Sequence, residues 1–250
     1  MTHLTKSYAG TPVLKGLDLT VPEGSVYALL GPNGAGKTTT VNICSTLLTA
    51  DGGEVRVAGH DVRREPDDVR ARIGVTGQFS AIDQFMTGRE NLRLMADLAH
   101  LDRRRARETT ETLLERFDLG DAADRRAMAY SGGMKRRLDL AMTLVGGPRV
   151  IFLDEPSTGL DPRSRRELWR IVREQVAEGV TVLLTTQNLD EADELADRVG
   201  VLDGGRLVAE GTPAELKRRV PGGAASLDDV FLTLTGHTTE DTTTEKDSVA

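Results

Sequence analysis

The chain has 250 residues, of which 38% are hydrophobic and 28% charged, and its formal net charge is −7 at pH 7. This length and balance are ordinary for a soluble globular protein with one large α/β domain, or one domain with a subdomain. The acidic balance argues against nucleic acid as a partner, because broad nucleic-acid binding usually shows a basic excess. Basic clusters at residues 103–105, 135–137 and 217–219 are interpreted as solvated helix faces.

Membrane and secretion signals are absent from the sequence pattern. No apolar run approaches the roughly 18 residues that a membrane helix needs, and the first ten residues lack the apolar core of a signal peptide. The single cysteine, Cys44, excludes an internal disulfide and fits a reducing cytoplasm. It falls in a predicted helix, where we expect it to be buried filler.

Strand patterns dominate the first part of the chain. Residues 17–30 predict two strands on either side of a Pro-Glu-Gly turn, and residues 53–60 predict another short strand. Together these strands predict a small antiparallel sheet that leans on the main core.

A helical pattern follows over residues 87 to about 127. Thr87 and Glu90 form a capping box at its start. Leucines then recur at helical spacing, namely Leu94, Leu98 and Leu101. We expect a helical insert over about residues 79–148, between two strands of the core.

The second half of the chain predicts a buried parallel sheet. Residues 150–156 and 180–187 are apolar, β-branched runs, which are typical of buried parallel strands. Between them Asp161 is predicted to cap, and Pro162 to open, a helix that runs to about Ala177. This strand, helix and strand form one βαβ unit.

The end of the chain predicts a hairpin and a short appended segment. Residues 199–211 read as two strands joined by an Asp-Gly turn. Thr212 and Glu215 form a capping box, so a short helix is expected within an appended segment at 212–235. Residues 236–250 are polar and threonine-rich, and we expect them to be disordered.

The segment GPNGAGKT at residues 31–38 matches the P-loop pattern and follows the strand VYALL. Its glycines let backbone N–H groups wrap the β- and γ-phosphates of a nucleotide. Lys37 supplies a positive charge to those phosphates, and the Thr38 hydroxyl reaches Mg²⁺. The predicted nucleotide-binding residues are Gly31, Pro32, Asn33, Gly34, Ala35, Gly36, Lys37, Thr38 and Thr39.

Two adjacent acids follow the apolar run VIFL. Asp154, at the end of a buried strand, can hold Mg²⁺ through water. Glu155 can orient or deprotonate an attacking water molecule. Buried charges need partners, so this pair predicts a site for chemistry rather than a core feature.

A second phosphate site is predicted at residues 130–141, YSGGMKRRLDLA. Two glycines after a serine open a helix, whose first turn leaves backbone N–H groups unpaired and carries positive dipole. One nucleotide cannot use both sites of one chain if this helix lies far across the insert.

In order and spacing, these motifs resemble the ATP-binding-cassette (ABC) nucleotide-binding domains over roughly residues 4–210. The resemblance is strengthened by STGLD at 157–161, which matches the family's D-loop, and by Gln78, which matches its Q-loop. Tyr8 stands where the family places the aromatic ring that stacks on adenine. In such proteins two domains meet head to tail, so each ATP is held by the P-loop of one chain and the SGG signature of the other.

The resemblance implies an α/β fold: a P-loop NTPase core with a parallel sheet, an antiparallel β subdomain and a helical insert subdomain, with the ATPase domain at residues 1–211. ATP and Mg²⁺ are the implied ligands. The signature residues that contact the partner's nucleotide are Ser131, Gly132 and Gly133. Gln78 and Gln187 join Glu155 as implied catalytic residues, and Gln78 joins Thr38 and Asp154 at the metal.

Three departures from the family pattern stand out. Met134 occupies a signature position where the wider family often has glutamine. Gln187 occupies the place of the switch histidine that touches the γ-phosphate; it offers an amide donor but cannot titrate, so turnover is expected to be slower or less sensitive to pH. Only three residues precede LTKSY, so either the family's first strand is missing or the true start lies upstream.

Within the family, the chain resembles the ATP-binding subunits of the daunorubicin-resistance type, on the stretches GQFSAIDQFMTGREN, YSGGMKRRLDLA and SLDDVFLTLTG. Such subunits energise exporters of drugs or antibiotics whose membrane part is a separate chain. The resemblance therefore implies a homodimeric ATPase that lies in the cytoplasm, on the inner face of the membrane, and pulls on a permease partner through the segment near Gln78.

Two alternatives remain open from the sequence. A soluble cassette ATPase of translation or DNA repair usually has two cassettes in one chain or a long coiled-coil insertion, and neither is visible here. A nucleotide-gated module with slow turnover is favoured by Gln187, whereas Glu155 argues against it. The transported molecule is not specified by the sequence, because the cassette does not touch it.

Overall fold

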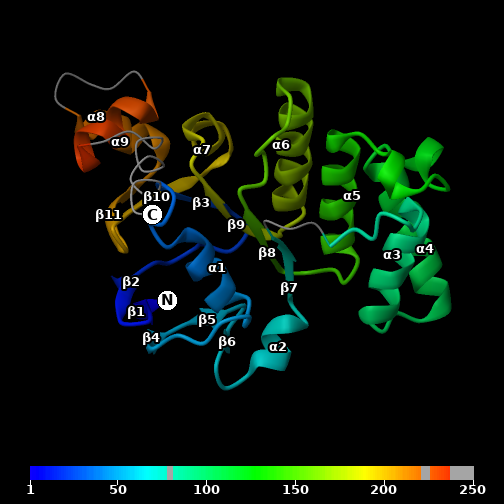
Figure 1. Ribbon diagram of the computed structural model, residues 1–250, viewed down its shortest axis with the longest axis horizontal. Helices are drawn as coiled ribbons and strands as arrows, with labels where there is room; N and C mark the ends of the chain where they lie inside the picture. Colours follow the sequence, from blue (N-terminus) through cyan, green and yellow to red (C-terminus); the bar gives the residue numbers. More distant parts are fainter. Residues whose placement is uncertain (78–80, 221–225, 237–250) are drawn as a thin grey trace, which may run out of the picture.

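The computed structural model describes residues 1–77, 81–220 and 226–236. Its centre is a six-stranded sheet with the strand order β11-β10-β3-β9-β8-β7 (Figure 1). Neighbouring strands are parallel throughout, except that β10 and β11 form an antiparallel hairpin. The strands of this sheet are β3 (Val26–Leu30), β7 (Ile73–Thr76), β8 (Val150–Asp154), β9 (Thr181–Thr186), β10 (Arg198–Asp203) and β11 (Arg206–Gly211).

The central strands are apolar because both faces of the sheet are covered. All five residues of β3 and all six of β9 are buried, as expected for parallel strands packed between layers. Since β3, β9 and β8 are adjacent and parallel, their carboxyl ends meet at one edge of the sheet. Whatever follows these strands in the sequence is therefore brought together in space.

A smaller antiparallel sheet, with the order β2-β1-β4, confirms the predicted β subdomain. Its strands are β1 (Thr2–Tyr8), β2 (Thr11–Leu17) and β4 (Gly52–Glu54). LTKSY lies within β1, so the first strand of this sheet includes the motif.

Two strand predictions in this region need correction. The first strand expected in residues 17–30 lies earlier, and residues 18–25 are outside the strands. Pro22 lacks a backbone N–H, and Gly24 adopts a positive φ of 66°, so the chain turns there instead of pairing. The single strand expected at 53–60 is divided into the end of β4 and the two-residue strands β5 (Arg56–Val57) and β6 (His60–Asp61), which form a hairpin.

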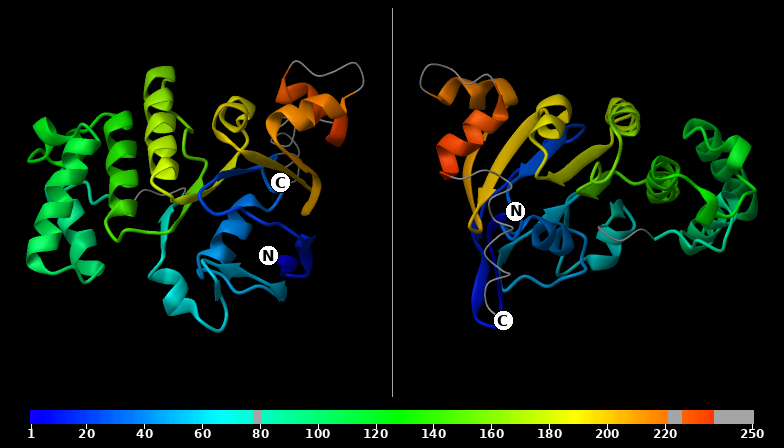
Figure 2. Two further views of the ribbon diagram at one scale, coloured as in Figure 1. Left: turned by 180° about the vertical axis from the view of Figure 1, so that it is seen from behind. Right: turned by 45° about the horizontal axis from the view of Figure 1, so that its top comes forward.

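The helical insert lies at one end of the molecule and the appended C-terminal helices at the other (Figures 1 and 2). The predicted capping box is confirmed: the Thr87 hydroxyl accepts from Glu90 N, and the Glu90 carboxylate accepts from Thr87 N. The inner face of the first helix is formed by Leu92 and Ala96, whereas Leu94 is 39% exposed and Leu98 is 64% exposed. The helices of this region are α3 (Gly88–Leu98), α4 (Arg103–Arg116) and α5 (Gly132–Leu144), with 3₁₀ turns at Gly120–Ala122 and Ala127–Ala129.

The βαβ unit forms as predicted. Asp161 Oδ1 accepts from Arg163 N at 2.9 Å and from Ser164 N at 3.0 Å, and Pro162 is the first helical residue. The remaining helices are α1 (Lys37–Cys44), α2 (Pro66–Arg70), α6 (Pro162–Ala177), α7 (Leu189–Leu195), α8 (Pro213–Arg219) and α9 (Leu227–Thr235).

The end of the chain also follows the sequence pattern. The Asp-Gly turn joins β10 to β11 through Gly204 and Gly205, both with positive φ. The Thr212–Glu215 capping box is present at the start of α8. Of the expected disordered tail, residues 237–250 lie outside the described part of the chain. Within the described ranges, no helix combines the length and apolarity needed to cross a bilayer.

Burial of Cys44 in α1 generates a simple prediction. The side chain is 2% exposed, and burial raises the pKa of its thiol to about 12. We expect a disulfide exchange reagent at pH 8 to leave the native chain unlabelled, because the thiolate is the reactive form. In concentrated guanidinium chloride one thiol per chain should react. Rapid labelling of the native chain would show that α1 is not packed as described.

Candidate functional site

The loop between β3 and α1 has a backbone that only glycine can adopt at several positions. Gly34 and Gly36 have φ values of 81° and 110°, in the left-handed region. A Cβ on Gly31 would lie 2.3 Å from the carbonyl oxygen of Leu202, and one on Gly36 would lie 2.6 Å from the side chain of Leu14. The glycines therefore let the loop lie against β10 and β2.

The start of α1 is suited to an anion. Its N-cap, Gly36, supplies no side-chain hydrogen bond, and its first turn holds no acidic residue. Backbone N–H groups at such a helix start carry partial positive charge and need acceptors. Thr38 is exposed and Thr39 is half-buried there. This geometry fits phosphate oxygens at residues 31–39.

Lys37 places a buried cation inside the loop. The residue is 6% exposed, and its Nζ donates to the carbonyl oxygens of Gly31 at 2.6 Å and Pro32 at 3.2 Å. The same Nζ lies 3.2 Å from Oε1 of Glu155. The ammonium group is thus surrounded by oxygen atoms, which is the environment a phosphate would also provide.

The two acids lie at the carboxyl end of β8. Asp154 is 3% exposed, and its Oδ1 accepts from the hydroxyl of Thr185 on β9. Glu155 has a φ of 49°, which is uncommon for a residue other than glycine and is typical of strained functional positions. The Glu155 backbone N donates to Thr185 O at 3.0 Å, which holds this turn on the neighbouring strand.

Glu155 has spare hydrogen-bonding capacity at a buried atom. Its Oε1 is within ion-pair distance of Lys37, but no donor in the described structure satisfies it with hydrogen-bond geometry. Buried polar atoms are rarely left in this state unless water, an ion or a ligand completes the site. The acid pair and the loop therefore fit a nucleotide phosphate together with its metal ion and a water molecule.

Gln187 follows β9 and reaches the same edge of the sheet. Its backbone N lies 3.3 Å from Oε2 of Glu155 and donates to it. The first residue of the loop is held there too, because Gly31 N donates to Thr186 O at 3.2 Å. The structure thus brings Gln187, Glu155 and Lys37 together. Gln78 lies outside the described residues, and its role stays a prediction.

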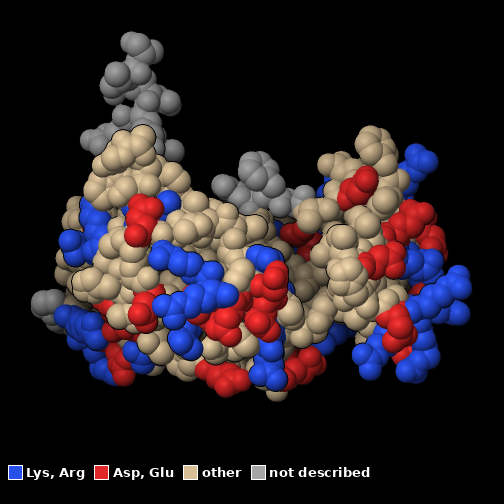
Figure 3. Space-filling model, turned by 90° about the horizontal axis from the view of Figure 1, so that it is seen from below, with Lys and Arg blue, Asp and Glu red and all other residues tan. Residues whose placement is uncertain are grey.

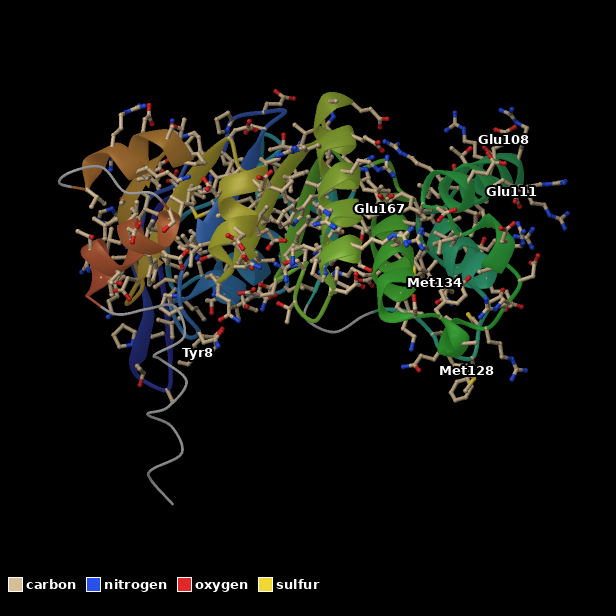
Figure 4. The ribbon with its side chains drawn as sticks, turned by 90° about the horizontal axis from the view of Figure 1, so that it is seen from above. Tyr8, Glu108, Glu111, Met128, Met134 and Glu167 are labelled. Atoms are coloured by element: carbon tan, nitrogen blue, oxygen red, sulfur yellow. The ribbon has the colours of Figure 1, made fainter. Side chains whose placement is uncertain are left out.

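Tyr8 lies at the tip of the β1–β2 hairpin and is 46% exposed (Figure 4). The Lys6 ammonium lies 5.7 Å from the centre of its ring. The hairpin flanks the loop, because Val13 O and the Leu14 side chain are the nearest atoms to a Cβ on Gly36. The position is compatible with adenine stacking, which stays a prediction.

The signature residues open α5. Ser131 caps this helix, since its hydroxyl accepts from Met134 N at 3.2 Å. Ser131 and Gly132 are exposed, and a Cβ on Gly133 would lie 2.6 Å from Ser164 Oγ, so α5 and α6 approach closely. A groove of about 570 Å³ lies there, lined in part by Ser131, Gly133, Met134, Arg163, Ser164 and Glu167 (Figure 4 labels Met134 and Glu167).

The two predicted phosphate sites are separate within the chain. Figure 1 shows α5 beyond β8 and β7, on the other side from α1. The signature at the start of α5 therefore does not complete the loop of its own chain.

Sequence reasoning missed several polar residues that support this site. Thr185 bonds both acids, and the pair of threonines at the end of an otherwise apolar strand could have indicated it. The basic cluster 135–137 is not simply a solvated face, because Arg136 is only 17% exposed at its side chain and pairs with the buried Asp139.

Glu191 is fully buried on α7 and accepts from Trp169 Nε1 at 3.1 Å. Because α7 begins with two neighbouring acids, Asp190 and Glu191, the sequence gave no indication that Glu191 is buried.

Comparison with known proteins identifies the family. The family model described as ABC transporter matches residues 14–158. The daunorubicin/doxorubicin resistance ATP-binding protein DrrA of Streptomyces peucetius is 58% identical over 214 residues, which make up 86% of this chain and 65% of that protein. The Nod factor export ATP-binding protein I of Rhizobium meliloti is 43% identical, over 85% of this chain and 64% of that protein.

Solved structures agree. An ATP-binding subunit of an ABC transporter superimposes with a TM-score of 0.84 at 29% identity, covering 94% of this chain and 98% of that one. The chain belongs to the ABC transporter family. It spans about two thirds of the length of the curated relatives it matches.

Lys37 is the residue of the loop whose removal has the clearest consequence. In Lys37→Ala we expect ATP affinity to fall roughly tenfold or more, because charge-assisted contacts contribute about 1.5–3 kcal/mol. Calorimetric titration measures this, with Lys15→Ala, an exposed lysine on β2, as the matched control. Unchanged affinity in a folded Lys37→Ala protein would contradict the assignment of the loop.

Proposed function

We propose that this chain is the ATP-hydrolysing, nucleotide-binding subunit of an ABC transporter that powers export of a drug, an antibiotic or a related hydrophobic compound through a separate membrane subunit. The observation that carries the hydrolytic part is the contact of Lys37 in the loop with Glu155 at the end of β8. The export part is supported by the names of the relatives, which concern daunorubicin and doxorubicin resistance and Nod factor export.

Some residues of the site bind the nucleotide and its metal ion, and others act in hydrolysis. The backbone N–H groups of residues 31–39 and the Lys37 ammonium hold the β- and γ-phosphates of ATP. Thr38 and Asp154, with Gln78, are the residues that would hold Mg²⁺, which neutralises developing phosphate charge when bound. Glu155 orients or deprotonates the attacking water.

Gln187 supplies an amide donor toward the γ-phosphate, and Tyr8 packs on the adenine. Because glutamine cannot titrate, Gln187 makes a nucleotide switch with slow turnover the second candidate function. The turnover number of the wild-type chain separates the two candidates.

The signature serves a second copy of the chain. Ser131, Gly132 and Gly133 lie exposed or half-exposed at the start of α5, away from the loop of their own chain. In a head-to-tail homodimer they contact the phosphates bound by the partner's loop. The dimer is placed on the inner face of the membrane by its permease.

The surface gives no support to a nucleic-acid partner on the face shown in Figure 3, where acidic and basic side chains lie intermixed. The net charge of −7 points the same way. A translation or DNA-repair role is therefore the less favoured alternative.

Glu155→Gln tests hydrolysis. We expect the variant to bind ATP but to hydrolyse it about 10²–10⁴ times more slowly, since the amide cannot accept the water proton. A phosphate-release assay gives the rate, and light scattering should show an ATP-dependent dimer. Turnover at the wild-type rate would move the catalytic base to another residue.

Mixing two inactive variants tests the shared site. Ser131→Arg should keep ATP binding by its own loop but block the partner's site, whereas Lys37→Ala does the converse. In a mixed dimer one site carries both defects and the other is intact, so ATPase activity should partly return on mixing. The matched control mixes the Lys37→Ala, Ser131→Arg double variant with wild type, which yields mixed dimers with no intact site. Verified mixed dimers without recovery would exclude the shared site.

A further inference from the structure

A buried ion pair on α5 stands outside the residues discussed as binding ATP. The side chains of Arg136 and Asp139 are 17% and 5% exposed, and Arg136 Nη1 lies 3.2 Å from Asp139 Oδ2. Both residues lie on the helix that the signature opens, within nine residues of Ser131. The pair is therefore rigidly connected to the signature.

Arg136 also reaches the catalytic edge of the sheet. Its Nε donates to Pro156 O at 2.7 Å. Pro156 directly follows Glu155, whose backbone is held in a strained conformation with φ 49°. The Arg136 guanidinium thus fixes one side of the turn that presents the Glu155 carboxylate.

Asp139, the ion-pair partner of Arg136, also contacts the segment before α3. Its Oδ1 accepts from Ala81 N at 3.3 Å. Ala81 lies three residues after Gln78. A continuous chain of hydrogen bonds therefore runs from Ala81 through Asp139 and Arg136 to Pro156.

Stability alone does not account for this pair. Burial lowers the pKa of Arg136, although the charges of Asp139, Glu191 and Asp154 oppose the shift, and Arg136 Nη2 is buried without a hydrogen-bond partner among the residues that the structure describes. Replacing a buried ion pair with apolar residues of similar volume is often neutral or stabilising. Folding stability by itself therefore does not require charged residues at these two positions.

We propose that Arg136 and Asp139 are positioning residues that fix Glu155 relative to the signature helix and to Ala81. The inference rests on the proposed function, because it takes Glu155 as the group that acts on water. A displacement of α5 or of Ala81 is transmitted to the Glu155 turn through Pro156. The hydrolytic geometry of one site is then set by the position of the signature helix of the same chain.

The test uses the full chain and the double variant Arg136→Met, Asp139→Leu. We expect kcat for ATP hydrolysis to fall about 10²-fold, because small misplacements of a catalytic group have effects of this size. KM for ATP should stay near the wild-type value, since the loop is untouched, and Tm should stay within about 4 °C of wild type. If the pair only stabilised the fold, the variant would have a lower Tm, and kcat would not fall selectively while KM stayed constant.

A second ion pair provides the matched control. Arg116 and Glu178 also join the helical insert to the core, through bonds of 3.0 and 2.7 Å. Within the described part of the chain, neither side chain bonds Pro156, Thr185 or Lys37. The variant Arg116→Met, Glu178→Leu should keep its ATPase rate. Wild-type kcat in the Arg136→Met, Asp139→Leu variant overturns the proposal.

Arg136→Lys decides the matter if the double variant does not fold. Lysine keeps a positive charge beside Asp139 but has no counterpart of the Arg136 Nε group that donates to Pro156 O. We therefore expect a reduced kcat at unchanged KM. An unchanged kcat overturns the proposal. Failure of the proposed function gives a different result: the wild-type chain itself would then hydrolyse no ATP.

Discussion

The buried ammonium group of Lys37 is the charge around which the site is arranged. A cation that is 6% exposed needs oxygen partners, and Lys37 finds them in Gly31 O, Pro32 O and the Glu155 carboxylate. Phosphate oxygens would compete with these partners for the ammonium group. Nucleotide binding and the position of the Glu155 carboxylate are thereby linked in one interaction.

The order of the strands makes that interaction possible. Because β3, β9 and β8 are adjacent and parallel, the loop after β3, the acids after β8 and Gln187 after β9 meet at one edge. The signature helix α5 is packed beyond β8 and β7, away from the loop of its own chain (Figure 1). One fold therefore carries both predicted phosphate sites, and the proposed function needs two copies to bring them together.

Features that depend on local chemistry could be predicted from the sequence. The loop at 31–38, the Asp161 cap with Pro162 and the capping box of Thr87 each depend on a few neighbouring residues, and each has the predicted structure. The strands at 17–30 and 53–60 were less predictable, because β pairing depends on partners far along the chain. Thr185 was missed because the acids that it bonds lie at the end of another strand. The burial of Arg136 and Asp139 was missed because it depends on contacts with Pro156 and Ala81, outside their own helix, and charged residues on a helix are more often solvated.

The competition between Glu155 and phosphate for Lys37 can be measured by calorimetric titration of wild type and Glu155→Gln with Mg²⁺ and a non-hydrolysable ATP analogue. Removing the carboxylate charge frees the ammonium group, so we expect a lower dissociation constant for Glu155→Gln than for wild type. The difference should shrink in Lys37→Ala, where no ammonium group is present to be shared. Equal or weaker binding by Glu155→Gln, in a protein that remains folded, would show that the carboxylate does not compete with phosphate for Lys37.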